Sequence, residues 1–209
     1  LGAAAQTEVR RILSFHIVSQ VGYMVLGLAL ATPLALAGAV FYLIHHIVVK
    51  ANLFFVGGLA ARITGSERLA HMGGLYVAAP ILAILFAIPA LSLAGMPPLS
   101  GFWAKLILIK ASLEGGFWWA AFFALLTGIF TILSMSKIWN EAFLKPHPKP
   151  EQMSASNESP RSAWATVAVL AVITVAVGLG AGPAMEYAWA ASEQLTEATV
   201  YLQLLGAAP

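Results

Sequence analysis

The chain has 209 residues, of which 60% are apolar and 10% are charged, and its formal net charge is +2. With a mean hydropathy of +0.84, this composition is typical of a membrane protein and unlike that of a soluble domain. The small net charge excludes a basic patch suited to nucleic acid, and the absence of cysteine excludes disulfides, thiolate metal sites and thiol catalysis.

The first residues, LGAAAQTEVRR, precede the first apolar segment. They begin with Leu rather than Met, and they have neither the apolar core nor the cleavage pattern of a signal peptide. The stretch resembles the end of a helix. We therefore expect the chain to be a fragment of a longer polypeptide.

Five segments are long and apolar enough to cross a hydrocarbon layer about 30 Å thick, and no soluble domain is expected between them. These spans are placed at about 12–31, 35–61, 77–112, 117–141 and 163–183. The predicted fold is an all-α, polytopic transmembrane helical bundle. It has a membrane core over 1–145, a loop over 146–162, and the last span with a C-terminal tail over 163–209.

The first span carries polar side chains at helical spacing. Four of them share one face of the helix: His16, Ser19, Gln20 and Tyr23. Such a stripe is suited to ordering water across the membrane. It is equally suited to hydrogen bonding between helices, so both interpretations stay open for His16.

The second span contains two histidines and a lysine in the stretch LIHHIVVKANLFF. Tyr42, His46 and Lys50 follow one another at intervals of four residues, so they stack on one helical face. A charged lysine at the centre of a span costs about 2.5–3.5 kcal/mol, and histidine changes its charge near neutral pH. This stripe predicts a proton relay, with a purely structural polar cluster as the alternative. His45 is turned about 100° from His46, and it fits helix packing as well as a relay.

The third segment is too long for one straight span, because its length as a helix would be about 54 Å. Its middle, SLAGMPPLSG, supplies a break through Gly95, Pro97, Pro98 and Gly101. Discontinuous helices of this kind often mark ion paths in transporters. Lys105 follows one turn after the break and is predicted as a second proton-carrying lysine. The alternative is a lysine that only donates hydrogen bonds to the carbonyls freed by the break.

The remaining two spans carry fewer candidates. Thr127, Thr131 and Ser134 share one face of the fourth span, where they either order water or pack against a neighbour. The connection KPHPKPEQMSASNESP predicts a flexible or extended loop. The fifth span contains no ionisable residue and is expected to be peripheral.

The basic residues predict the orientation of the bundle. One side carries eight of them, whereas the other side carries only Lys110. By the positive-inside rule, the start of the chain and the loops 62–76 and 142–162 face the cytoplasm, and the C-terminus is external.

Acidic residues are placed differently. The chain contains no aspartate, and its glutamates fall in loops, at helix ends or in the tail. Sodium prefers oxygen ligands, so the acidic site of a transported cation is expected elsewhere, in the missing N-terminal part or in another subunit. No P-loop, HExxH pair or nucleophile elbow is present, and no cofactor is expected.

Four stretches carry a family resemblance: TEVRRILSFHIVSQVGYMVLGL, AGAVFYLIHHIVVKANLFFVGG, IPALSLAGMPPLSGFWAKLILIK and SMSKIW. They are similar to the second half of the antiporter-like membrane subunits shared by Mrp-type Na+/H+ antiporters and respiratory complex I. The sequence is closest to that of the Mrp D subunit, notably in FHIVSQVGYM, HHIVVK and GFWAK. The resemblance covers about residues 1–145.

This resemblance implies a subunit of two inverted repeats, each with a discontinuous helix and a buried lysine, of which the chain supplies the second. Lys105 matches the lysine of the second discontinuous helix, and His46 and Lys50 match the histidine and lysine of the preceding helix. The first half, with its glutamate and lysine pair, is not in this chain. Family members usually carry lysine where TEVRR has Arg10. Arginine keeps the charge but not an easily titrated proton, so Arg10 is left out of the relay.

We therefore predict a proton-translocating subunit of a hetero-oligomeric Na+/H+ antiporter in the plasma membrane. Its partners are other membrane subunits, protons, Na+ and lipid. Lys50 would exchange protons with Lys105 through His46 and ordered water, and His45, His16 and Tyr42 complete the predicted proton path. Two alternatives remain open. One is a homologous proton-pumping subunit of a complex I or membrane hydrogenase assembly, and the other is a non-transporting scaffold subunit.

Overall fold

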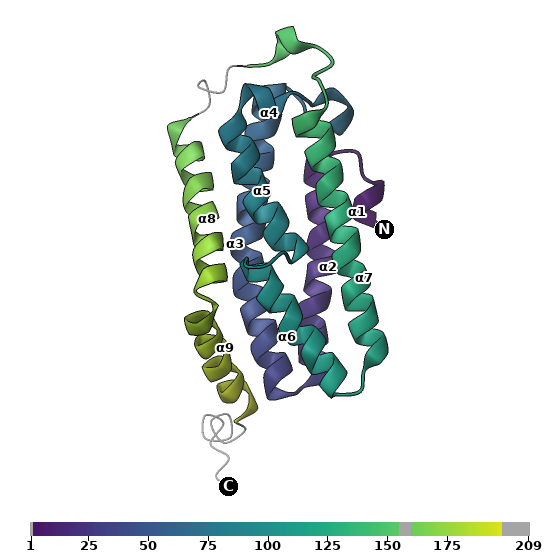
Figure 1. The fold of residues 1–209 in the computed structure, drawn as a ribbon, viewed down its shortest axis with the longest axis vertical. Helices are drawn as coiled ribbons and strands as arrows, with labels where there is room; N and C mark the ends of the chain where they lie inside the picture. Colours follow the sequence, from purple (N-terminus) through teal and green to yellow (C-terminus); the bar gives the residue numbers. More distant parts are fainter. Residues whose placement is uncertain (1, 155–159, 198–209) are drawn as a thin grey trace, which may run out of the picture.

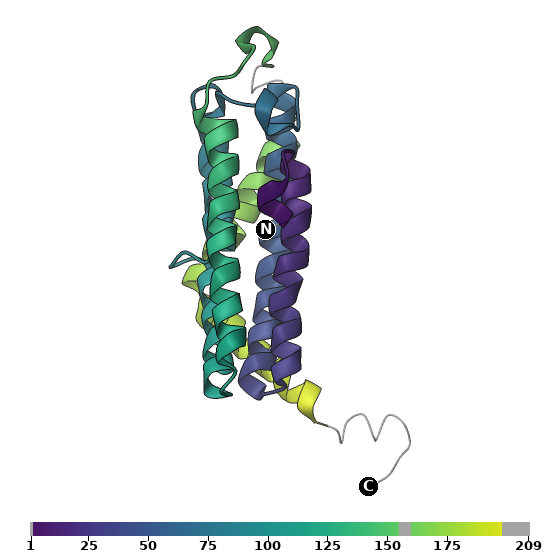
Figure 2. The ribbon, with the colours of Figure 1, turned by 90° about the vertical axis from the view of Figure 1, so that its right-hand side faces the viewer.

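The computed structural model describes residues 2–154 and 160–197, and this part of the chain is a bundle of helices (Figure 1). The long helices run up and down one common axis, as Figures 1 and 2 show from two sides. The helices are α1 (Gly2–Ala5), α2 (Val9–Leu30), α3 (Pro33–Thr64), α4 (Leu75–Ala78), α5 (Pro80–Ala94), α6 (Ser100–Glu114), α7 (Trp118–Ile138), α8 (Arg161–Leu179) and α9 (Ala181–Thr196). Short turns complete the described part: η1 (Leu69–His71), the π-helical η2 (Trp139–Leu144) and η3 (Pro150–Gln152). The prediction of an all-α bundle is confirmed.

Helix α3 is the central element. It has 32 residues and packs against α2, α5, α6, α8 and α9 (Figure 1). Its start is fixed by Pro33 in the first turn and by the Thr32 side chain, which accepts a hydrogen bond from the Ala35 amide at 3.2 Å. Its end is fixed by Gly65, which adopts the left-handed conformation at φ 73°. Because α3 touches most of the bundle, its polar residues meet several other helices.

Within residues 2–154 and 160–197, four helical stretches are long and apolar enough to cross a membrane: Val9–Leu30, Pro33–Thr64, Trp118–Leu144 and Arg161–Leu179. Each of them matches a predicted span. The third predicted segment is divided into α5 and α6, of 15 residues each. The two halves follow one another along the bundle with the break near its middle (Figure 1). The predicted discontinuous span is therefore present.

The connection between α5 and α6 covers residues 95–99 and contains the predicted breakers. Gly95 ends α5 in the left-handed conformation at φ 93°, and its amide donates to the carbonyls of Leu91 and Ser92. Proline has no amide donor, so Pro97 and Pro98 cannot extend the helix through this point. The break thus follows from the local sequence.

The C-terminal region differs from the prediction. The sequence predicts a tail after a span ending at about residue 183, whereas the structure forms a second helix, α9, over Ala181–Thr196. Gly180 interrupts the helix with φ −98° and ψ 42°, so α8 ends at Leu179 and α9 follows it as a separate helix. Helices α8 and α9 together run along α3 (Figure 1). Residues 198–209 of the predicted tail, and 155–159 of the predicted loop, lie outside the described residues.

Two apolar clusters fill the bundle toward its two ends. One contains Leu13, Val49 and Leu82, with aromatic rings around Phe143. The other surrounds Phe41 and includes residues of α6, α7 and α9. Polar side chains of the central helices lie between these clusters, and they form the candidate site.

Candidate functional site

Twelve of the buried polar side chains in the described part of the chain, drawn from five helices, make up the candidate site. Their burial requires an explanation because polar groups are costly in a membrane interior unless they find partners. They are His16, Gln20, Tyr23, Tyr42, His45, His46, Lys50, Ser92, Ser100, Lys105, Thr131 and Ser134.

Lys50 lies toward one end of this polar region. Its side chain is 5% exposed, and its Nζ donates a hydrogen bond to the carbonyl of Leu13 on α2 at 2.9 Å. His46, one turn earlier on α3, is 8% exposed, and its Nε2 has no protein partner in the described part of the chain. The predicted face of Tyr42, His46 and Lys50 is thus buried, and it meets α2.

The centre of the polar region joins α2, α3 and α7. Tyr42 donates a hydrogen bond to Oε1 of Gln20, and the Gln20 amide donates to Oγ1 of Thr131 at 3.4 Å. One turn away, His16 Nε2 and Ser134 Oγ are 2.6 Å apart. The stripes predicted on the first and fourth spans therefore face each other across the bundle, as interhelical hydrogen bonding requires.

His45 connects α3 to the helix break. Its Nδ1 lies 2.8 Å from Oγ of Ser100, the first residue of α6. Ser100 Oγ in turn lies 3.1 Å from Oγ of Ser92 near the end of α5. The Gly101 amide also donates to Ser92 Oγ, at 3.3 Å. His45, predicted for either packing or relay, thus bonds directly to the residues at the break.

Lys105 crosses the break from the α6 side. Its Nζ donates to the carbonyls of Leu93 and Ala94, at 2.8 and 3.0 Å, and it lies 5.5 Å from the centre of the Tyr23 ring. An ammonium group at the end of α5 also complements the negative end of that helix dipole. Lys105 therefore makes the contacts expected from the alternative interpretation, in which the lysine only donates hydrogen bonds to the carbonyls freed by the break. The same contacts hold a titratable amine beside the break.

Tyr23 and Tyr42 link the two lysine regions. Their rings stack at a centroid separation of 5.0 Å, and Tyr42 also meets His45 edge-on at 5.6 Å. No hydrogen bond joins Lys50 to Lys105 directly in the described structure. The groups between them are aromatic hydroxyls, imidazoles and an amide.

Several buried polar atoms have no protein partner in the described part of the chain: Nδ1 of His16, Nε2 of His45, Nε2 of His46, and both amide atoms of Asn52. Buried polar groups normally find a partner, and bound water is a common one. Three of these residues belong to the predicted proton path, whereas Asn52 was not predicted. Sequence spacing gave no signal for Asn52, because one amide in an apolar helix sets no pattern.

The structure also adds two serines to the predicted residues. Ser92 and Ser100 flank the break, and both are buried. A serine pair eight residues apart in sequence indicates nothing until the break brings its members together. Among the described residues, no cluster of histidine, cysteine or acidic side chains is suited to hold a metal ion.

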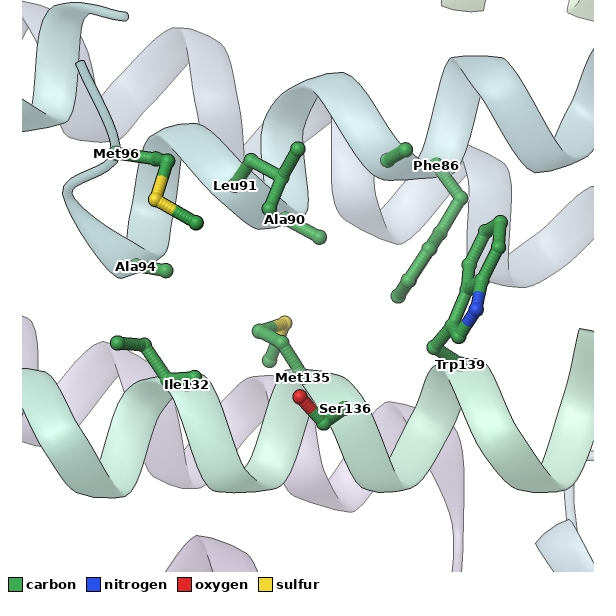
Figure 3. Close-up of a pocket in the computed structure, with 10 residues that line it drawn as sticks. Phe86, Ala90, Leu91, Ala94, Met96, Ile132, Met135, Ser136 and Trp139 are labelled. Atoms are coloured by element: carbon green, nitrogen blue, oxygen red, sulfur yellow. The ribbon is translucent and has the colours of Figure 1, made fainter.

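A groove of about 270 Å³ lies between α5 and α7, separate from this hydrogen-bonded network. Figure 3 shows Phe86, Leu91 and Met96 on one wall facing Met135 and Trp139 on the other. Ser136 is the only hydroxyl in a lining that is otherwise hydrocarbon, aromatic or thioether. Such a surface suits apolar groups rather than a hydrated ion.

Comparison with known proteins identifies the family to which the chain is similar. Residues 1–131 match the family model described as NADH:quinone oxidoreductase/Mrp antiporter, transmembrane. The chain is 42% identical over 203 residues to the D subunit of a Na+/H+ antiporter of Alkalihalophilus pseudofirmus, covering 97% of the chain and 41% of that protein. It is 36% identical over 148 residues to the N subunit of an NADH-quinone oxidoreductase of Desulforudis audaxviator, covering 71% of the chain and 30% of that protein.

A solved structure supports the same relationship. The chain superimposes on a chain of the Mrp complex from a Dietzia species with a TM-score of 0.85 and 35% sequence identity, covering 97% of this chain and 45% of that one. The chain spans about two fifths of the length of the antiporter relative from Alkalihalophilus pseudofirmus. The family model, the sequence relatives and the solved structure agree with one another and with the helices and the break described above. The chain belongs to the NADH:quinone oxidoreductase/Mrp antiporter transmembrane family.

Proposed function

We propose that the chain is the C-terminal part of a proton-translocating subunit in a multisubunit Na+/H+ antiporter. The proposal is supported by the similarity to proteins named as the D subunits of Na+/H+ antiporters. One structural observation carries it: Lys50 and Lys105 are both buried, together with hydrogen-bonded histidine, tyrosine, glutamine and serine side chains of α2, α3 and α6. Buried amines in such surroundings are costly, and they are typically retained for function.

In the proposed mechanism, Lys50 and Lys105 exchange protons through His46, His45 and ordered water. Nε2 of His46 and Nε2 of His45 have no partner among the described residues, so they are suited to bind that water. Protonation of one lysine raises the cost of a second positive charge nearby, so occupancy passes from one amine to the next. Tyr42 and His16 extend the path toward α2 and α7.

The helix break supplies the second part of the proposed mechanism. Lys105 donates to the carbonyls of Leu93 and Ala94, which are among the last carbonyls of α5 and have no partner within that helix. Neutral Lys105 would hold these carbonyls less strongly than the ammonium form, because hydrogen bonds from a charged donor are stronger. The protonation of Lys105 is thereby coupled to the geometry of residues 95–101.

The proposed setting follows from the charge distribution. The chain is part of a multi-pass membrane protein, and we assign the end that carries Arg10, Arg62 and Lys145 to the cytoplasm of the cell because basic loops remain inside. That assignment makes the loop 146–162 cytoplasmic and the end of α9 external. Other membrane subunits, protons, Na+ and lipid are the proposed partners. The acidic site for Na+ is assigned to another part of the complex. The activity is transport by secondary antiport rather than enzymatic catalysis.

A proton-pumping subunit of a complex I or membrane hydrogenase assembly is the second candidate. The 36% identity to the N subunit of an NADH-quinone oxidoreductase favours keeping it. In that case the same lysines would carry protons, and a redox reaction elsewhere in the assembly would supply the energy. Quinone-binding or iron–sulfur subunits in the purified complex would support this candidate, whereas Na+-dependent proton movement without them supports the antiporter. The third candidate, a scaffold subunit, predicts that the lysines are dispensable.

We test the proposal with Lys50→Ala in the whole subunit, assembled in its complex and placed in membrane vesicles. Na+-driven proton movement per assembled complex should fall about tenfold or more, because a positioned proton carrier typically contributes 10²–10⁴-fold to a transfer step. The matched control is Lys110→Ala. Lys110 is an exposed lysine that pairs with the exposed Glu114 at 3.7 Å, so this variant should remain within about twofold of the parent. Equal rates for the two variants would exclude Lys50 from the path and favour the scaffold.

A further inference from the structure

The junction of α8 and α9 lies against the break between α5 and α6. The two helix pairs are adjacent along the bundle (Figure 1). Gly178, close to the end of α8, meets the backbone of Pro98, Leu99 and Ser100. The end of α8 therefore reaches the helix break of the candidate site.

Glycine is the only residue type that fits this contact. A Cβ atom built on Gly178 would lie 2.7 Å from the Pro98 oxygen, 2.7 Å from the Ser100 nitrogen and 2.8 Å from Leu99 Cα. All three are backbone atoms, so no side-chain rotation would relieve the overlap. Even alanine at position 178 would push the connection between α5 and α6 away from α8. Small residues allow such close backbone approach between membrane helices.

A hydrogen bond holds the same contact from the α6 side. Nε1 of Trp103 donates to the Gly178 carbonyl at 3.1 Å. That carbonyl is among the last four of α8, which have no donor within a regular helix that ends at Leu179. Trp103 lies one turn after Ser100 on α6, so the bond ties the first turn of α6 to the end of α8.

Ser100 joins this outer contact to the inner hydrogen bonds. Its amide nitrogen faces Gly178, while its hydroxyl bonds to His45 and Ser92. A displacement of Ser100 by a fraction of an ångström would therefore change the His45 contact. It would also move Lys105, which lies five residues further along the same helix.

We propose that Gly178 and Trp103 are positioning residues for proton transfer at the break. The α8–α9 junction holds the first turn of α6, and through Ser100 and Lys105 it sets the geometry of the relay. This inference rests on the proposed function. It assigns a role in transport to a helix pair without any titratable group at the contact.

The test uses Gly178→Ala and Trp103→Phe in the whole subunit within its assembled complex, with Gly182→Ala as the control. A Cβ on Gly182 would meet no atom within 4 Å. Gly178→Ala should lower Na+-driven proton movement per assembled complex about tenfold or more, because small misplacements at a reacting centre have effects of up to about 10²-fold. Trp103→Phe keeps an aromatic ring but loses the donor, and it should lower the rate about threefold to tenfold. Gly182→Ala should stay within about twofold of the parent.

The pH profile separates positioning from simple loss of folded protein. Ser100 adjoins His45 of α3, whose ring meets that of Tyr42, and Lys105 adjoins Tyr23 of α2. Repositioning changes the surroundings of these groups, so the pH midpoint of transport should move by about half a unit or more. A purely structural defect would lower the rate by the same factor at every pH.

Each outcome decides the proposal. It is supported if Gly178→Ala and Trp103→Phe assemble, transport slowly and shift the pH midpoint. It is overturned if transport per assembled complex and the pH profile match those of Gly182→Ala, even when the amount of complex falls. If Gly178→Ala does not assemble, Trp103→Phe decides alone. Full transport by Lys105→Ala would instead overturn the proposed function itself, whatever the other two variants do.

Discussion

Replacing Lys105 with alanine should abolish Na+-driven proton movement, with a loss of about 100-fold or more per assembled complex. The basis is the usual 10²–10⁴-fold contribution of a positioned proton donor or acceptor. Lys105 is 6% exposed, and its amine touches the carbonyls of Leu93 and Ala94 and the face of Tyr23. No other titratable amine is placed at this break in the described structure, so no neighbour should replace it. The measurement is proton uptake or release by vesicles on addition of Na+.

Lys105→Arg separates the two roles of this side chain. Arginine restores N–H donors for the carbonyls at the end of α5, but it does not release its proton in the physiological range. A lysine that only caps α5 would be replaced by arginine with recovery of transport. We expect Lys105→Arg to recover the amount of assembled complex while proton movement stays near that of Lys105→Ala. Recovery of transport by arginine would contradict the relay.

Lys105→Ala should also destabilise the complex, because the buried carbonyl of Leu93 and the partly buried carbonyl of Ala94 lose their donor. An unsatisfied buried polar group costs about 1–3 kcal/mol. The amount of assembled complex should be determined for each variant, for example by native electrophoresis of solubilised membranes. Transport is then compared per complex. This separation keeps the stability effect apart from the loss of a proton carrier.

The architecture was largely predictable because membrane spans are long apolar segments and because the residues that break the third segment can be recognised in the sequence. Twenty apolar residues indicate a span on their own, and Pro97 with Pro98 excludes a continuous third helix. The face of Tyr42, His46 and Lys50 was predictable for a similar reason. Positions four residues apart on a helix share a side whatever surrounds it.

Contacts between helices were not predictable in the same way. His45 bonds to Ser100, and Tyr42 bonds to Gln20, only because of the register of α3 against α6 and α2. Periodicity within one helix does not set that register. The two interpretations left open for His45 therefore needed the structure. It places His45 at the break, in contact with the first residue of α6.

Helix α9 was missed because its composition is not that of a span. Glycine, proline, alanine and glutamate dominate its first turns, and such a stretch predicts a tail. Packing against α3, with Ala188 and Ser192 buried, stabilises the helix instead. Gly178 was overlooked for a related reason. A glycine in an apolar helix indicates close packing only once the neighbouring backbone is known.

Gly101→Ala should strongly reduce both the stability of the complex and its transport. The substitution disturbs the hydrogen bonds at the break, although it removes no titratable group. A Cβ on Gly101 would overlap the Ser92 carbonyl and lie 2.9 Å from Cε1 of His45. The ends of α5 and α6 would have to separate. That separation would strain the bonds from Ser92 Oγ to Ser100 Oγ and to the Gly101 amide, at 3.1 and 3.3 Å.

The expected cost of Gly101→Ala is about 1–3 kcal/mol in the stability of the complex, the usual range for overpacking a tight interior. Transport per complex should fall about tenfold or more, since His45 loses its position against Ser100. The control is Gly58→Ala on α3, where a Cβ meets no atom within 4 Å. Glycine within a helix is less stable than alanine by about 0.5–1 kcal/mol, so Gly58→Ala should be neutral or stabilising.

Thermal unfolding of the solubilised complex and vesicle transport together decide this prediction. Opposite signs of the two stability changes would show that the Gly101 effect comes from the contact with Ser92 rather than from helix propensity. If Gly101→Ala melted and transported like Gly58→Ala, the close approach of α5 and α6 would not control proton transfer. The break would then need to act through Lys105 alone, because its backbone geometry could change without consequence.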